Sequence, residues 1–189
     1  MKEDMYYIDS EIRSAAFELG NKLFDLIKNI DKEFNNIAFV CIGTDRSTGD
    51  CYGPLVGHFL SKIKLYEFDL YGTLEEPVHA ININKVLDEI DMSNTLIIGI
   101  DASLGRLDNI KNIRVGCGGI RPGSGVGKEL PMIGDIHLAG IVNISGFMPI
   151  DVLQNTRLNT VYRMAEVTAS AIQFALYEKE IYRKSTMHI

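Results

Sequence analysis

Two short, unbroken apolar runs constrain the fold of this chain more than any other feature of its sequence. One is Ile37–Ile42 (IAFVCI) and the other is Thr95–Ile100 (TLIIGI). Neither run alternates apolar with polar residues, and both are too short for a typical buried helix. Continuous apolar runs of this length are typical of strands that are buried on both faces, as in the parallel sheets of α/β proteins. We therefore predict a central sheet with helices packed on it.

Helical and strand-like patterns alternate along the rest of the chain. Apolar residues spaced three and four apart predict an N-terminal helix over about 10–30 and a long C-terminal helix over about 155–181. Asp9 or Ser10 is placed to cap the first of these helices. Further helices are expected at 54–64 and 82–90, and further strands at 66–71, 113–115 and 136–142. The alternation predicts an α/β fold with a mostly parallel sheet, and no linker or repeat divides 1–189 into more than one domain.

Composition and charge exclude several classes of function. The 189 residues carry a net charge of −6 and the longest basic run is Arg183–Lys184, so we expect no nucleic-acid partner. The sequence contains no apolar run of about 18 residues, and its polar start does not resemble a signal peptide, so no membrane association is predicted. An odd number of cysteines (Cys41, Cys51 and Cys117) indicates reduced thiols in the cytoplasm. Formation of a homo-oligomer is left open.

Carboxylates follow both apolar runs, at the position where ligands usually bind in open α/β sheets. The loop Gly43–Asp50 carries Asp45 and Asp50, and Asp101 directly follows the second run, at the start of a turn expected over 101–108. If the two strands are neighbours, Asp101 faces Asp50 or Asp45 across a shared cleft. Two close carboxylates can hold one proton between them, so that one activates water and the other protonates a leaving group. They could equally hold a divalent cation, or cap a helix or an Asx turn.

A glycine-rich segment, Ile120–Lys128, is the third unusual feature. Its glycines stand at alternate positions and allow the backbone to approach a ligand closely: Gly123, Gly125 and Gly127. Arg121 can bind a carboxylate through two parallel hydrogen bonds. The alternative is a flexible hairpin or crossover loop. The segment matches neither the dinucleotide-binding nor the P-loop pattern, so no nucleotide cofactor is predicted.

Three segments taken together resemble a known family: Ile42–Gly57 (IGTDRSTGDCYGPLVG), Ile100–Gly105 (IDASLG) and Ile120–Asn143 (IRPGSGVGKELPMIGDIHLAGIVN). Over about 35–180 the chain is similar to sporulation proteins of the YyaC type. That family in turn resembles the germination protease of spores and the hydrogenase-maturation proteases. The resemblance implies a three-layer α/β/α sandwich of the phosphorylase/hydrolase-like kind.

The resemblance also implies roles for individual residues. Asp50, in Asp-Cys-Tyr-Gly-Pro, and Asp101, in Asp-Ala-Ser-Leu, match the catalytic aspartates of the germination protease. The segment 121–127 resembles its Arg-Pro-Gly loop, and Asp45 and Arg46 are then expected to tune the site and to contact substrate. This chain is much shorter than the germination protease, so the substrate does not carry over. In the hydrogenase-maturation relatives comparable acids bind a metal together with a histidine, and no motif here marks such a histidine.

We therefore expect a peptidase of the sporulating cell or spore that cleaves a protein or peptide substrate with Asp50 and Asp101 and requires no cofactor. Two alternatives stay open. One is a catalytically inactive protein that binds a peptide or has a regulatory role on the same fold. The other is a hydrolase that depends on a divalent metal.

Overall fold

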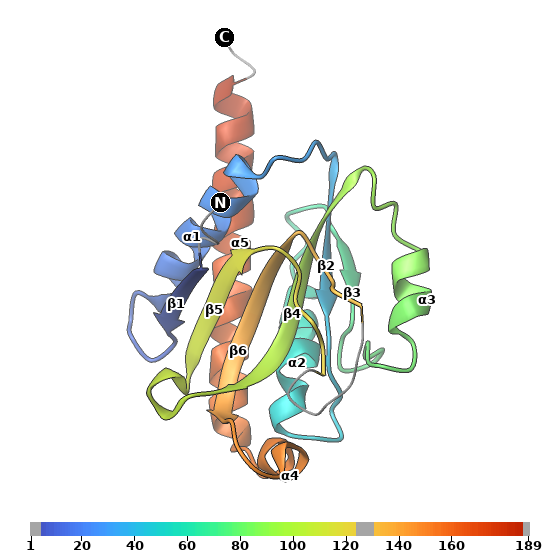
Figure 1. Ribbon diagram of the computed structural model, residues 1–189. Coiled ribbons are helices and arrows are strands. Elements are labelled where there is room, and N and C mark those ends of the chain that lie inside the picture. The colour runs from blue at the N-terminus through green and yellow to red at the C-terminus, as the bar shows by residue number, and fades with distance from the viewer. Residues whose placement is uncertain (1–4, 124–130, 187–189) are drawn as a thin grey trace.

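The fold is built on a six-stranded sheet with the strand order β1-β5-β6-β4-β2-β3 (Figure 1). It is seen in a computed structural model that describes residues 5–123 and 131–186. The two apolar runs form β2 and β4, which pair side by side. The strands are β1 (Met5–Asp9), β2 (Asn36–Cys41), β3 (Asp69–Tyr71), β4 (Thr95–Gly105), β5 (Asn112–Cys117) and β6 (Ile136–Ile144).

The sheet is mixed. β2 pairs parallel with both β3 and β4, and β4 pairs parallel with β6. β5 pairs antiparallel with β6, and β1 pairs antiparallel with β5. Among the described residues no helix lies between β5 and β6, and a connection without a helical crossover favours an antiparallel return. The prediction of an α/β fold is confirmed, whereas the mostly parallel sheet is not.

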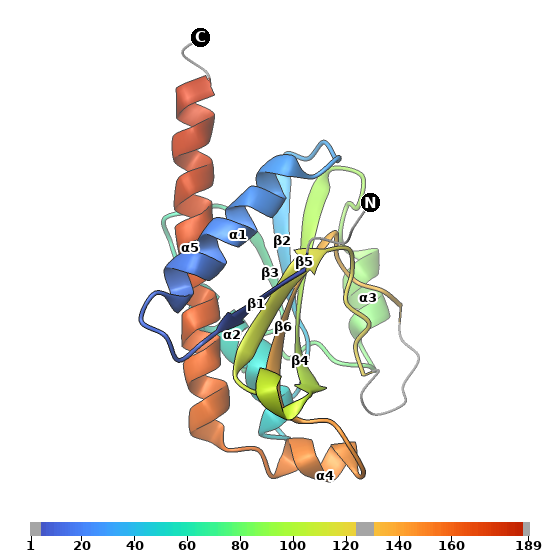
Figure 2. The same ribbon diagram turned by 60° about the vertical axis from the view of Figure 1, so that its left-hand side comes forward.

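Three helices cover one face of the sheet (Figure 2). They are α1 (Ala15–Asn29), α2 (Tyr52–Leu60) and α5 (Leu158–Thr186). Leu19 and Leu23 of α1 and Ile172 of α5 belong, with strand residues, to one large buried cluster. Within it the hydroxyl groups of Tyr52 and Thr168 form a hydrogen bond of 2.6 Å. That bond offsets the cost of burying two polar groups in an apolar core.

The opposite face is covered by α3 (Ile83–Asp88) and by residues 118–123 and 131–135, which lie between β5 and β6 in the sequence (Figure 2). The buried cluster beneath them is smaller, and it includes Val40, Ile97 and Ala139. Ile120 and Ile133 form an isolated antiparallel bridge with two backbone hydrogen bonds of 2.8 Å. This bridge joins residues 118–123 to residues 131–135, and both Ile120 and Ile133 belong to the buried cluster.

The N-terminal part of the chain differs from the prediction. β1 precedes the first helix, and it is an edge strand that pairs only with β5. α1 begins at Ala15 rather than near residue 10, so neither Asp9 nor Ser10 caps it. Asp9 instead accepts a hydrogen bond of 2.9 Å from the backbone N–H of Glu11, in the turn that leaves β1. The capping prediction is wrong because β1 extends to Asp9 and a turn over 10–14 follows it before the helix begins.

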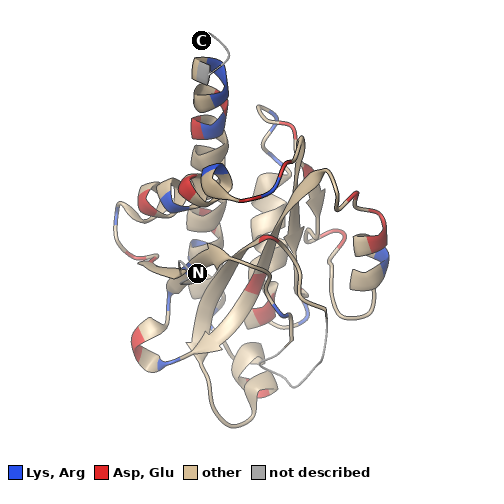
Figure 3. Cartoon of the chain, turned by 45° about the horizontal axis from the view of Figure 1, so that its top comes forward, with Lys and Arg blue, Asp and Glu red and all other residues tan. Residues whose placement is uncertain are grey.

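Charged residues are spread over the whole molecule. Figure 3 shows Lys and Arg interspersed with Asp and Glu on the helices and loops rather than gathered on one face. The charged side chains of the described residues therefore form a mixed surface, on a chain whose net charge is −6. Within the described residues, the structure contains no helix long and apolar enough to cross a membrane.

Two close backbone contacts join α2 to the strands beside it. A Cβ atom built on Gly53 would lie 2.1 Å from the carbonyl oxygen of Ile42, and one on Gly57 would lie 1.8 Å from that of Gly72. In a close-packed interior such overlaps cannot be relieved without moving the backbone. Glycine at these positions therefore lets α2 start directly beside the end of β2.

We predict that Gly53→Ala destabilises the protein by about 1–3 kcal/mol, because the added methyl group forces α2 away from Ile42. Urea unfolding measures the change. Gly146→Ala is the matched control, since no atom lies within 4 Å of a Cβ at that position. The control should leave the free energy of unfolding within about 0.5 kcal/mol of wild type. Equal effects of the two substitutions would contradict this account of the packing.

Candidate active site

The candidate site lies where β2 ends and β4 continues. β2 pairs with β4 as far as Cys41 and Ile100, whereas β4 goes on pairing with β6 to Gly105. Asp101 is therefore the first residue of β4 beyond the end of β2. The turn expected from Asp101 onward is wrong, because β6 extends the ladder with a bulge between Ser103 and Leu104. Bulges of this kind are common beside active sites.

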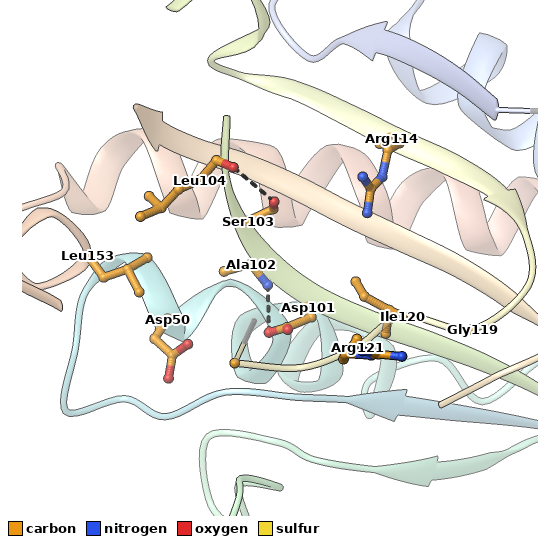
Figure 4. Close-up of a pocket in the computed structure, with 11 residues that line it drawn as sticks. Asp50, Asp101, Ala102, Ser103, Leu104, Arg114, Gly119, Ile120, Arg121 and Leu153 are labelled. Atoms are coloured by element: carbon orange, nitrogen blue, oxygen red, sulfur yellow. Dashed lines mark hydrogen bonds between the residues drawn. The ribbon is translucent and has the colours of Figure 1, made fainter. Parts of the chain in front are cut away.

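A short helical turn brings Asp50 to the same place. The loop after β2 leads into a 3-10 helix, Gly49–Cys51, which continues as α2. The backbone N–H of Thr44 donates to the carbonyl oxygen of Asp50 at 3.2 Å and closes the loop. A helix missed by the sequence prediction, α4 (Pro149–Gln154), packs on this turn so closely that a Cβ on Gly49 would lie 2.8 Å from Leu153. Figure 4 shows the side chains of Asp50 and Asp101 beside each other on the cavity wall.

Two cavities meet at these aspartates. The first has a volume of about 250 Å³ and the second about 300 Å³. Asp50, Asp101 and Gly123 line both cavities. The other polar side chains are Ser103, Arg114 and Arg121 in the first cavity, and Thr44, Asp45, Arg46 and His79 in the second. A ligand that occupied both cavities would pass directly over the two carboxylates.

The two carboxyl groups have different environments. Asp101 is only 5% exposed, whereas Asp50 is half-buried. Burial raises the pKa of Asp101 well above that of an ordinary aspartate, and the negative charge of Asp50 raises it further. The backbone N–H of Ala102, which donates to Asp101 Oδ1 at 2.8 Å, acts in the opposite direction. Asp101 therefore retains its proton at pH values at which an exposed carboxyl group has lost it.

The residues predicted to contact substrate are divided between the two cavities. Arg121 lines the first, and the exposed residues Asp45 and Arg46 line the rim of the second. Gly123 borders both and has a φ of 67°, a backbone conformation that favours glycine. Gly125 and Gly127, also predicted as contacts, lie outside the described residues.

The cavity-lining residues that were not predicted as site residues from the sequence include Ser103, Arg114 and His79. Ser103 follows Asp101 by two residues, so a longer strand would have placed both on one face of the sheet. Arg114 lies inside a strand that the sequence does predict, but its orientation depends on how β5 pairs with β6. His79 is held near the end of β2 by the bridge between Ile42 and Val78, and no local pattern marks it.

The cysteine near the site is not an activated nucleophile. Burial raises the pKa of the Cys51 thiol to about 11, and the charges of Asp45 and Asp50 contribute to the increase. Burial also raises the pKa of Cys41. A thiol that remains protonated at neutral pH is a poor nucleophile.

The described residues do not fit a resident metal ion. No three His, Cys, Asp or Glu side chains among them come together as a ligand cluster. His79 lines the second cavity, but its Nδ1 accepts a hydrogen bond from the backbone N–H of Ile81 at 3.4 Å. Within the described part of the chain, no histidine joins Asp50 and Asp101 as the third ligand that the hydrogenase-maturation resemblance would require.

Comparisons with known proteins place the chain in a family. Residues 6–171 match a family described as "protein of unknown function (DUF1256)", and the chain belongs to that family. A Bacillus subtilis (strain 168) protein, described as the uncharacterized protein YyaC, is 51% identical over 138 residues. The aligned part covers 72% of this chain and 67% of that relative. The YyaC-type resemblance is thereby confirmed at the level of the family.

We predict that Asp101→Asn stabilises the protein increasingly as pH rises. The folded state binds the Asp101 proton more tightly than the unfolded state, whose pKa is about 3.9. The wild-type protein therefore loses stability as pH rises above that value, and the asparagine variant does not. Thermal unfolding at about pH 4 and about pH 8 measures the difference, with about 2–4 °C in Tm for each kcal/mol.

Ser103→Ala is the control, because it alters the same face of β4 without adding or removing a titratable group. Its Tm difference from wild type should be the same at both pH values. An Asp101→Asn difference that stays constant or shrinks as pH rises would contradict the buried, protonated state of Asp101.

Proposed function

We propose that this member of the DUF1256 family is a peptidase in which Asp50 and Asp101 act as a general base and a general acid. The observation that carries the proposal is the position of the two carboxylates, one buried and one half-buried, at the junction of two cavities. Unequal environments separate the protonation states of paired carboxyl groups, and such a separation allows one to accept a proton while the other donates one.

The environments suggest which residue has which role. Asp50, on the more exposed side, removes a proton from a water molecule whose oxygen attacks the carbonyl carbon of the peptide bond. Asp101, which keeps its proton because it is buried, transfers that proton to the leaving nitrogen as the C–N bond breaks. The products are a carboxylic acid and an amine. The proton taken up by Asp50 replaces the one lost by Asp101, so the pair returns to its starting state.

The free edge of β4 supports a peptide as the substrate. Beyond Ile100, β4 has a strand neighbour only on the β6 side within the described part of the chain. Its other edge, at Ala102 and Leu104, borders the first cavity. An extended peptide can add to such an edge as a further strand, with main-chain hydrogen bonds that hold it in place. A peptide bound there would run past Asp101.

We also propose an architecture, a distant evolutionary relationship and a cellular role for this protein. These are the three-layer α/β/α architecture of the phosphorylase/hydrolase-like kind, a distant relationship to the germination protease, and a role in the cytoplasm of sporulating cells or spores. The mixed α/β sheet, the pair of aspartates and the family match support these points. A protein that binds a peptide in the same cleft without cleaving it is the principal alternative, and the next experiment separates the two.

We predict that the purified chain cleaves proteins in a spore extract and that Asp50→Asn or Asp101→Asn lowers the rate by at least about 100-fold. Mass spectrometry of newly formed N-termini measures cleavage. Asp108→Asn is the control, because this exposed aspartate lies in the turn after β4 and lines neither cavity. Cleavage that survives both site substitutions would refute the proposed roles, and binding of fragments without any cleavage would favour the peptide-binding alternative.

The pH dependence of cleavage offers a separate test. Because Asp101 must be protonated to act as the acid, kcat/KM should fall as pH rises through its raised pKa. The measurement is a pH profile from about 4 to about 9 on one cleaved peptide. A rate that continues to increase across the alkaline half of this range would show that a protonated Asp101 is not required.

A further inference from the structure

Arg114 lies across the sheet from Asp101. Ala139 of β6 is paired with Asp101 of β4 on one side and with Arg114 of β5 on the other. Directly paired residues project to the same face of a sheet, so all three side chains point to the face covered by α3. Two strand spacings separate the Cα atoms of Arg114 and Asp101, a distance of about 10 Å. Ala139 between them is small, and Figure 4 shows Arg114 extending from β5 over β6 toward the cavity.

No described residue forms a hydrogen bond or an ion pair with the guanidinium group of Arg114. Its Nε atom is buried, and no described residue accepts a hydrogen bond from it. Neither Arg114 nor Arg121 takes part in an ion pair between described residues. Buried donors in folded proteins are nearly always paired, because an unpaired one loses its hydrogen bonds to water without replacement. An unpaired, charged donor on a cavity wall therefore indicates a ligand that accepts from it.

We propose that the first cavity binds a carboxylate of the substrate, with Arg114 as its principal partner and Arg121 at the exposed rim. A guanidinium group presents two parallel N–H donors that match the two oxygens of a carboxylate. The bound carboxylate belongs to an acidic side chain or to a chain terminus next to the bond that is cleaved. This assignment of a substrate class rests on the proposed peptidase function and adds a specificity to it.

The acidic residues of the cavity favour a carboxylate over a phosphate group. Asp50 and Asp101 line the same cavity of about 250 Å³ as Arg114. A phosphate group, which carries up to two negative charges, would meet more repulsion from these acids than a carboxylate with one. Ser103 lies on the same face two residues beyond Asp101 on β4 and lines the same cavity, and its hydroxyl group, which donates to the Leu104 carbonyl at 3.2 Å, provides a further polar contact.

The first experiment profiles cleavage of a library of proteome-derived peptides by the wild-type chain. An acidic residue or a free C-terminal carboxylate should be enriched next to the cleaved bond. Three versions of one cleaved peptide then show whether the bound carboxylate comes from a side chain or from the C-terminus. One has Glu and an amidated C-terminus, one has Gln and an amidated C-terminus, and one has Gln and a free C-terminus. Wild type should prefer one carboxylate-bearing version over the amidated Gln version by about 10- to 100-fold in kcat/KM.

Arg114→Met should abolish this preference, because the methionine retains the apolar stem without the charge. The readout is the ratio of kcat/KM for the carboxylate-bearing and amidated Gln peptides with the same variant, so a general change in rate does not affect it. Arg163→Met on α5, an exposed arginine on the other side of the sheet, is the control and should retain the preference. Arg114→Lys provides a second test, and it should weaken the preference without abolishing it, since lysine has charge but no paired donors. Cleavage without an acidic preference, or a preference that survives Arg114→Met, overturns the carboxylate site and leaves the peptidase proposal standing.

A binding measurement decides the question if no peptide is cleaved. The ¹H–¹⁵N signal of Arg114 Nε, identified by its absence in Arg114→Met, is followed during titration with the pentapeptide Ac-Ala-Ala-Glu-Ala-Ala-amide. The Gln version with an amidated terminus and the Gln version with a free terminus are titrated in parallel. A shift with a carboxylate-bearing peptide, but not with the amidated Gln peptide, supports the carboxylate site even though the peptidase proposal has failed. Equal shifts, or none, overturn it.

Discussion

β4 extends beyond β2 at its carboxyl end, and the candidate site depends on that difference in strand length. If β2 were as long as β4, Asp101 would have a strand neighbour on both sides and would not be accessible to a ligand. Because β2 stops at Cys41, its chain turns away through Gly43 and returns as the helical turn that carries Asp50. β4 continues because β6 still pairs with it. The end of β2 at Cys41 therefore leaves space for the cavity and exposes one edge of β4. It also places Asp50 near Asp101.

Without a bound ligand, this arrangement of buried polar groups lowers the stability of the folded protein. Burial of a carboxyl group beside a second carboxylate costs stability, and the single backbone hydrogen bond from Ala102 offsets only part of that cost. Arg114 adds a buried donor that no described residue accepts from. Features that reduce stability within one cavity are expected at functional sites, where the ligand supplies the missing interactions. The large apolar cluster beneath α1, α2 and α5 provides the stability that tolerates them.

The central strands and the long helices can be predicted from the sequence because their signals are local. A strand that is buried on both faces has an unbroken run of apolar residues, and both runs of this kind in the sequence form strands, β2 and β4. The edge strand β1 leaves no comparable signal, since its stability comes from β5, about a hundred residues away in the chain. The end of β4 is missed for the same reason, because its last residues, which include the polar Asp101 and Ser103, stay in the sheet through their pairing with β6.

The site could be predicted only in part. The predicted strand ends indicate Asp101 and the loop with Asp45 and Asp50 as site residues. The resemblance to the germination protease then favours Asp50 over Asp45 as the partner of Asp101. In the structure Asp50 lines both cavities with Asp101, whereas Asp45 is exposed on the rim of one. Arg114 could not be recognised as part of the site, because its relation to Asp101 follows from the register of three strands rather than from any spacing along the chain.

The central claim is that Asp50 and Asp101 form a coupled pair in which Asp101 holds the proton. A ¹³C NMR titration of the aspartate carboxyl carbons tests it directly, in the wild-type chain and in Asp50→Asn. We predict that the Asp101 carboxyl group titrates well above the ordinary aspartate range, and that removal of the Asp50 charge lowers its pKa while burial keeps it above that range. An Asp101 signal that titrates in the ordinary range, unchanged by Asp50→Asn, would contradict the account.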